Sequence, residues 1–336
     1  MVWDHTDTTV KLTAGRHVVT LAAQSLDGTQ TTKGDAILDR IVLSLPSAPA
    51  GSSVYEAELA DLGKATPVYG TAAGAGASGA GGVQVPVRDA VTFWVYSAKD
   101  DESTLDVGML DTGTVRVAVN GQDVLMASSG HTTTAVSLSG GVNKVTLTGV
   151  SRTSLVDRLT VTPSAGHLAP TTYQAEDATL AGTAAVTPLL LADGGAAVTG
   201  VGGDPGNGNT LTFSVKAQKA GTYAMRVRYS NPEQSPASHY NPDPIARHAD
   251  ISVNGGAAQR VLFPHTFHQD NFWELTVVVQ LDRGTNTVTF SSAELPNMDG
   301  TYASQVYPTI PLRSKYAPLI DQITVAPFSK PIDATS

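Results

Sequence analysis

An internal repeat constrains this chain more than any other feature, because repeated segments mark copies of one structural unit. Each copy has two alternating segments about a glycine turn, followed by a short apolar segment with a central aspartate. The hairpin segments span 10–22, 136–148 and 275–291, and the aspartate segments span 37–43, 155–161 and 319–325. Alternation with period two predicts antiparallel strands that bury one face.

An opening segment precedes only two of the copies: Tyr55-Glu56-Ala57-Glu58 and Tyr173-Gln174-Ala175-Glu176. We therefore expect complete β-sandwich modules at 53–163 and 171–328, with residues 1–44 as the C-terminal fragment of a third. Two or three strands are marginal alone because a sandwich needs both sheets, which favours a piece cut from a longer protein. The alternative is a native N-terminal hairpin docked on the next module.

Composition narrows the possible partners. A net charge of −9 argues against nucleic acid or an anionic membrane, because both attract basic surfaces. The chain has no cysteine, which removes disulfides as a source of stability. This does not indicate a cytosolic protein, because a metal ion can stabilise an extracellular domain instead. No apolar run approaches the roughly 18 residues of a membrane helix. The first residues do not resemble a signal peptide, which is uninformative if the chain is a fragment.

The closing segments each place one carboxylate among apolar side chains. Asp39, Asp157 and Asp321 share a strand face with Leu, Ile or Val two residues away on either side. A buried, unpaired carboxylate costs several kcal/mol, so each must be paired or must bind a metal. The opening segments supply complementary oxygen donors two residues apart, namely Glu56 with Glu58 and Gln174 with Glu176. We expect a structural Ca²⁺ site, and the alternative is an ion pair or hydrogen bonds to turn amides.

Six short motifs occur in order along the second module and together resemble carbohydrate-binding modules of family 35, which is related to family 6. They are the Tyr-Gln-Ala-Glu opening, 221–231 (GTYAMRVRYSN), 253–255 (VNG), 272–273 (FW), 281–288 (LDRGTNTV) and 316–321 (YAPLID). The resemblance extends more loosely over 53–163 and the N-terminal stub.

Several properties follow from this resemblance. It implies β-jelly-rolls with a structural calcium between the first and last strands, held by Glu56, Glu58 and Asp157 in one module and Gln174, Glu176 and Asp321 in the next. Gln174 replaces the more usual acid, which weakens the expected site. The resemblance also implies non-catalytic polysaccharide binding outside the cell, by a monomer fused to an upstream glycoside hydrolase or polysaccharide lyase.

A sugar site needs an exposed aromatic plane with hydrogen-bonding groups around it. Trp273 matches the family position of a stacking tryptophan, and its alternative role is a core or rim anchor. Asn231 and Tyr316 flank the same end in the family. Tyr240 and Arg247 lie in a long irregular stretch, which in a compact domain is usually functional or disordered. Arg247 could bind a uronate carboxylate or could be an ordinary solvated cation.

The first module departs from this pattern, since no tryptophan precedes Val136 and the segment at 107–109 is shortened. Its exposed candidate is Trp94, which could form a second site or a contact between modules. An enzyme is disfavoured, because no Ser-His-Asp order, phosphate loop or metal-hydrolase helix motif is present. His265, His268 and Asp270 imitate a zinc site only loosely. An adhesive or structural sandwich without saturable sugar binding is the alternative function.

Overall fold

The computed structural model describes residues 18–20, 41, 51–73, 76–79, 81–164, 168–203, 208–232, 246–293 and 316–330. The expected all-β fold class is confirmed, since this part of the chain forms strands and three short 3-10 helices. None of its helices has the length and apolarity needed to cross a membrane. The proposed N-terminal fragment, including Asp39, lies outside the described residues apart from 18–20 and 41.

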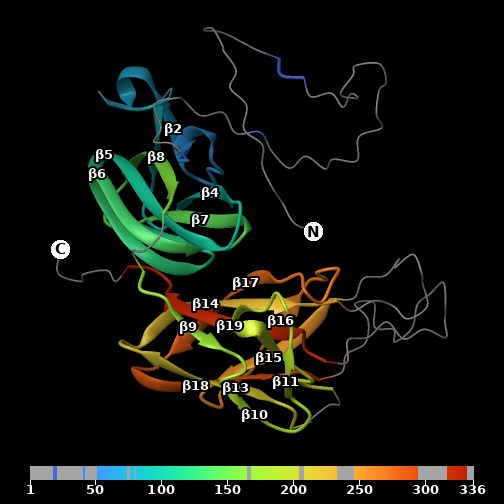
Figure 1. Ribbon diagram of the computed structural model, residues 1–336. Helices are drawn as coiled ribbons and strands as arrows, with labels where there is room; N and C mark the ends of the chain where they lie inside the picture. Colours follow the sequence, from blue (N-terminus) through green and yellow to red (C-terminus); the bar gives the residue numbers. More distant parts are fainter. Residues whose placement is uncertain are drawn as a thin grey trace, which may run out of the picture.

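The strands fall into two groups, which we call the first and the second module (Figure 1). The first module contains β1 (Ser53–Glu56), η1 (Ala57–Leu59), β2 (Thr66–Tyr69), η2 (Gly70–Ala72), β3 (Gly81–Val85), β4 (Ala90–Ser97), β5 (Asp101–Val119), β6 (Gln122–Leu138), β7 (Gly141–Gly149) and β8 (Ser154–Pro163). The second contains β9 (Thr171–Gln174), β10 (Thr179–Leu180), β11 (Ala185–Pro188), η3 (Asp193–Gly195), β12 (Ala196–Thr199), β13 (Leu211–Ala217), β14 (Gly221–Ser230), β15 (Arg247–Val253), β16 (Gln259–Phe263), β17 (Trp273–Leu281), β18 (Gly284–Ser291) and β19 (Leu319–Pro327).

The second module is a sandwich of two antiparallel sheets. One sheet has the order β10-β13-β18-β15-β16, and the other has the order β11-β12-β19-β14-β17 with β9 paired to β19. Alternating apolar residues of both sheets fill the core, where Phe213 meets Phe290 edge-on with ring centroids 5.7 Å apart. The period-two pattern of the sequence therefore corresponds to one buried face per sheet.

The first module has the same strand neighbours but only one continuous sheet, because two long strands run through both layers. Residues 103–109 of β5 pair with β8, and residues 115–119 of the same strand pair with β7. Strand β6 follows β5 along both halves. In the second module, β14 pairs with β19 and β15 pairs with β18. Strand β5 thus corresponds to β14 and β15 joined end to end, and β6 corresponds to β16 and β17.

The end of the second module packs into the first. Phe328 is 3% exposed and belongs to the apolar core of the first module. The backbone N–H of Ser137 donates to the Phe328 carbonyl, and the N–H of Lys330 donates to the Ala135 carbonyl, both at 3.0 Å. Residues 328–330 thereby cover the outer edge of β6, so the two modules share a packed interface.

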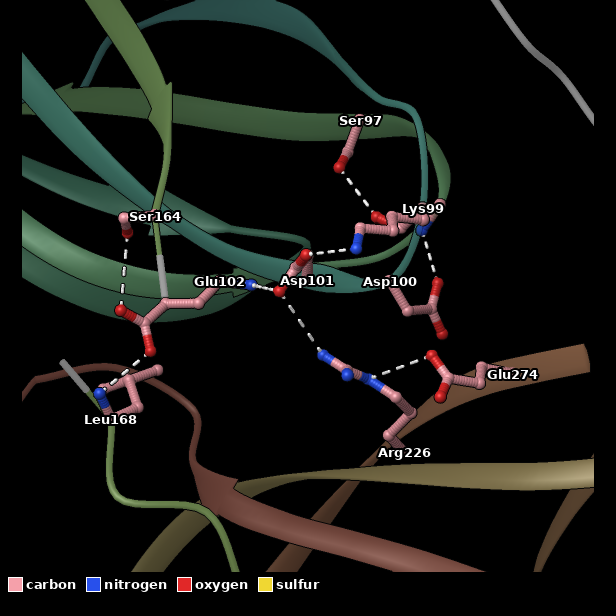
Figure 2. Close-up of polar contacts among 10 residues, drawn as sticks. Ser97, Lys99, Asp100, Asp101, Glu102, Ser164, Leu168, Arg226 and Glu274 are labelled. Carbon is pink, nitrogen blue, oxygen red and sulfur yellow. Dashed lines mark hydrogen bonds and ion pairs between the residues drawn. The ribbon is translucent and has the colours of Figure 1, made fainter. Parts of the chain in front are cut away.

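Polar contacts surround this interface (Figure 2). Arg226 of β14 lies 3.8 Å from Asp101 of the first module and 3.7 Å from Glu274 of its own. Glu102 is 9% exposed and accepts the backbone N–H of Leu168 at 2.9 Å. The linker after β8 is therefore tied to the first module by a buried carboxylate.

Candidate functional site

The opening and closing strands of each module are neighbours, as a Ca²⁺ site between them requires. We call the three expected ligands of each module its staple: Glu56, Glu58 and Asp157 in the first, and Gln174, Glu176 and Asp321 in the second. Strand β1 pairs with β8 and places Glu56 opposite Arg158, while β9 pairs with β19 and places Gln174 opposite Gln322. Asp157 is 4% exposed and Asp321 is fully buried, so the predicted burial of both carboxylates is confirmed.

In the first module, one loop connects all three acids. The backbone N–H of Ser78 donates to Asp157 Oδ1 at 2.7 Å, and the Ser78 hydroxyl donates to Glu56 Oε2 at 2.6 Å. Gly79 follows with a left-handed φ of +57°, and a Cβ on it would lie 2.8 Å from Glu58 Oε1. Burial raises the pKa of Glu56, and the nearby carboxylates Glu58 and Asp157 raise it further, against the Ser78 hydrogen bond and the Arg158 charge, which lower it. Glu56 therefore interacts electrostatically with both other acids across this loop.

The second module repeats this arrangement with different side chains. The N–H of Asp193 donates to Asp321 Oδ2 at 3.3 Å, and Gln174 Nε2 donates to Asp193 Oδ2 at 2.7 Å. Gly194 is left-handed like Gly79, with φ +74°, and a Cβ there would collide with Glu176. Each staple thus combines a closing aspartate, two donors from the opening segment and a left-handed glycine behind the second donor.

Three buried oxygens of the second module are suited to a calcium ion. Gln174 Oε1, Glu176 Oε2 and Asp321 Oδ1 are buried oxygens with no hydrogen-bond partner among the described residues. Unsatisfied buried oxygens of this kind suit a hard cation, which is bound by carboxylate and carbonyl oxygens. No group of three or more His, Cys, Asp or Glu side chains in the described ranges is itself arranged as a metal cage. The chemistry of the donors fits calcium, with backbone carbonyls or water needed to complete its coordination.

Arg228 distinguishes the second staple from the first. Its guanidinium donates to Asp321 Oδ2 and to the Leu191 carbonyl, and it lies 4.5 Å from the centroid of the Phe272 ring. In the first module, Arg158 Nε is 3.9 Å from Asp157 Oδ2. The second staple therefore has a closer fixed cation and one acid fewer, which lowers its demand for a metal ion.

Several strand ends of the second module meet at one end of its sandwich, beside the loop 264–272. Strand β14 ends at Ser230 opposite the start of β19, and β17 begins at Trp273 opposite Tyr229. Two insertions, 231–246 and 264–272, separate β14 from β15 and β16 from β17. The first module lacks both, because β5 and β6 continue through the corresponding positions. We call the end at which β14 ends, β17 begins and the loop 264–272 lies the loop end of the second module. The first module has no such loop at this end.

Three of the predicted sugar contacts lie at this end. Trp273 is partly buried and packs against the core of its module. Arg247 Nη1 donates to the Ala317 carbonyl at 3.3 Å. Tyr316 pairs with Gly202, and its ring packs where a Cβ on Gly203 would come within 3.2 Å of it. The structure brings these side chains to one end of the sandwich, and their contact with a ligand stays a prediction.

The other two predicted contacts differ. Asn231 is fully buried, and its Nδ2 donates to the Phe263 carbonyl at 3.1 Å. Its backbone N–H donates to Thr266 Oγ1, and its carbonyl accepts the Thr266 N–H at 2.8 Å. Asn231 thus fastens the loop 264–272 to β14, and any direct sugar contact by it stays a prediction. Tyr240 lies outside the described residues.

Sequence reasoning missed Phe267 as a site residue. It is 63% exposed with a φ of +70°, a left-handed conformation that costs a bulky residue about 1–2 kcal/mol. Its ring meets His265 with centroids 4.9 Å apart and Trp273 with centroids 6.1 Å apart, at interplanar angles of 73° and 61°. The only sequence signal was an aromatic inside a polar loop between two strands.

His265 is the second residue that was missed in this role. It is 7% exposed, and both ring nitrogens are buried without a hydrogen-bond partner among the described residues. Each unsatisfied buried polar group costs about 1–3 kcal/mol. The zinc-like trio of His265, His268 and Asp270 does not assemble, since His268 Nδ1 instead accepts the N–H of Asp270 at 3.1 Å.

Trp94 of the first module lies on β4 and is 50% exposed, with Lys144 Nζ 5.8 Å from its ring centroid. Strand β4 is the last strand in the sheet order of that module. Its assignment as a second site or as a contact surface stays open.

No family model matches this chain. It is similar to a curated 3-O-α-D-galactosyl-α-L-arabinofuranosidase from Bifidobacterium longum subsp. longum, with 25% identity over 312 residues. The match covers 82% of this chain and 27% of that enzyme, so the chain spans about a quarter of its relative.

Solved carbohydrate-binding modules of family 35 are similar to about half of the chain. A module from Clostridium thermocellum is 31% identical, with a TM-score of 0.37, over 46% of this chain and 98% of that one. A module from Paenibacillus barcinonensis is 22% identical, with a TM-score of 0.32, over 46% and 97%. An exo-β-1,3-galactanase from Phanerochaete chrysosporium, solved with galactose, is 21% identical with a TM-score of 0.37, over 57% and 41%.

Proposed function

We propose that this chain binds carbohydrate at the loop end of the second module and performs no catalysis itself. The gathering of Trp273, Arg247 and Tyr316 at that end carries the proposal. An aromatic ring suits the apolar face of a sugar, while a guanidinium and a phenol hydroxyl suit its hydroxyl groups or a uronate carboxylate. The described loop 264–272 at this end has no counterpart in the first module, where β6 continues through the corresponding positions.

Calcium is proposed to stabilise both modules without taking part in recognition. Glu56, Glu58 and Asp157 would hold it in the first module. Gln174, Glu176 and Asp321 would hold it in the second. The bound ion would neutralise the buried Asp157 or Asp321 together with the partly buried donors beside it, and it would tie the closing strand of each module to the opening segment.

The proposed setting is a larger, secreted enzyme. The curated relative is a glycosidase of which this chain matches 27%, which supports a role as an accessory region of a glycoside hydrolase or polysaccharide lyase. In that setting, weak binding would hold the catalytic domain near its polymer. The name of that relative makes galactose-containing oligosaccharides the first probes. We also propose that the protein acts outside the cell and as a monomer.

Binding of the whole chain to a glycan array, with calcium and after chelation, tests the function. Millimolar to micromolar saturable binding is expected for at least one oligosaccharide, and Trp273→Ala is expected to weaken it at least tenfold. The same preparations are assayed for release of reducing sugar. The adhesive alternative predicts no saturable binding in any arm, and release of sugar would refute the non-catalytic role.

A further inference from the structure

We propose that Phe267 is the surface on which a pyranose ring of the ligand stacks, and that His265 reads one of its hydroxyl groups. This inference rests on the proposed carbohydrate function and names two residues that would contact the sugar. Trp273 then acts as a supporting wall, because it is partly buried against the core while Phe267 is 63% exposed.

The backbone around Phe267 is held in a conformation that a bulky residue seldom adopts. Its φ of +70° persists only where neighbouring contacts fix it, and such outliers gather at functional sites. Those contacts are present on both sides. Thr266 donates its N–H to the Asn231 carbonyl at 2.8 Å, and Asn271 Nδ2 donates to the Thr266 carbonyl at 2.7 Å. The His268 carbonyl accepts the Ser230 hydroxyl at 3.1 Å. The loop therefore presents the phenyl ring to solvent in a fixed orientation.

The exposure of Phe267 leaves room for a sugar, since 63% of the residue is open to solvent. His265 and Trp273 meet the phenyl ring at 73° and 61°, so neither stacks parallel to it. T-shaped contacts of this kind hold the ring in place from its sides, while part of its surface stays open to solvent. A pyranose can then place its C–H face on the exposed phenyl. A rigid aromatic presented this way loses little conformational entropy on binding.

His265 supplies the polar group that such a site needs. Both of its ring nitrogens are buried without a partner among the described residues, and its ring centroid lies 4.9 Å from that of Phe267. A neutral imidazole offers one donor and one acceptor, and a sugar hydroxyl offers the same pair in reverse. A sugar hydroxyl, or one water that bridges to it, completes the hydrogen bonding of His265 once ligand binding opens access to its buried nitrogens. Discrimination between sugars follows from the position of that hydroxyl.

The test uses the full chain and isothermal titration with β-1,3-galactotriose, β-1,4-mannotriose and digalacturonate. With the tightest of these probes, Phe267→Ala and Phe267→Gly are expected to weaken affinity at least tenfold. Phe267→Trp is expected to retain it within about threefold. The glycine variant relieves the backbone strain, so its melting temperature is expected to equal or exceed that of the wild type. Tyr69→Ala removes an aromatic of similar exposure from the first module and is the matched control.

His265→Phe keeps the ring and removes both nitrogens. Its melting temperature is expected to stay level or rise, while affinity falls at least fivefold; a merely structural role would leave affinity unchanged and overturns the assignment of His265. Unchanged binding in Phe267→Ala, with loss in Trp273→Ala, overturns the stacking role and leaves the proposed function standing. A wild-type chain that binds none of the probes or glycans overturns both.

Discussion

Phe328→Ala tests whether the two modules form one cooperative unit. Phe328 belongs to the last segment of the second module, yet it is 3% exposed inside the core of the first. Truncating a buried phenylalanine costs about 3–5 kcal/mol, from lost burial and the cavity left behind. If both modules unfold as one unit, an unfolding entropy of about 2.1 cal/mol/K per residue makes each kcal/mol shift the melting temperature by roughly 1.5 °C. The variant is therefore expected to melt at least about 4 °C lower.

Scanning calorimetry measures both the shift and the number of transitions. We expect one main transition in the wild type and two separated transitions in Phe328→Ala, because the variant loses a buried apolar side chain that the second module contributes to the core of the first. Lys330→Ala is the matched control. Its side chain is exposed, and its hydrogen bond to Ala135 uses the backbone N–H, so the change should stay within about 0.5 kcal/mol. Two independent wild-type transitions, or a shift below about 2 °C, would refute the reasoning.

Three further predictions concern the staples and one buried histidine. Saturating calcium is expected to raise the melting temperature, with about 2.7 kcal/mol of stabilisation at 100 times Kd. Asp157→Asn should remove more of that rise than Asp321→Asn, because Arg228 already balances the charge of Asp321. Equal losses in the two variants would contradict this. Gly79→Ala is expected to destabilise the chain by about 1–2 kcal/mol, because an alanine is strained at a φ of +57°. It is also expected to weaken calcium binding, measured by titration, because the new Cβ would lie 2.8 Å from Glu58 Oε1. Unaltered calcium affinity would contradict a role for Gly79 in leaving room for the Glu58 carboxylate. Burial lowers the pKa of His248 below its ordinary 6.5, and Arg260 lowers it further, against Asp250 and a backbone hydrogen bond that raise it. The unfolded chain therefore takes up the proton at a higher pH than the folded chain. Stability should fall as pH drops below about 6.5, by at most about 1.4 kcal/mol per pH unit. Urea titrations from pH 7.5 to 5 should show a shallower slope in His248→Gln, and parallel slopes would exclude this histidine.

The sequence predicted the frame of each module because its determinants are local. Alternation identified the strands, and the aspartates of 155–161 and 319–325 could be placed among apolar neighbours from spacing alone. Their burial and the adjacency of opening and closing strands are confirmed. The calcium ion itself stays a prediction.

The site was less predictable because it depends on loop conformation. Nothing local distinguishes an outward phenylalanine at 267 from an inward one, since its orientation depends on hydrogen bonds to Asn231 from a distant strand. The joining of two strands into β5 was also hidden. The shortened segment 107–109 was visible, but the continuation of the pairing through it was not. Likewise, spacing within one module could not place Phe328 in the core of another.

The joined strands also explain why the first module needs its neighbour. Among the named strands of the described part, β6 pairs with β5 alone. Its outer edge would be open without the bridge from Val136 to Ser329, and an open edge invites pairing with other chains. Residues 328–330 cover part of that edge with backbone hydrogen bonds to Ala135 and Ser137, and Phe328 fills the core beside it. The same chain segment follows β19, whose Asp321 belongs to the second staple. Folding of β19 into the second module therefore positions residues 328–330 against β6 of the first. The loop end of the second module is thus part of a unit that contains both modules.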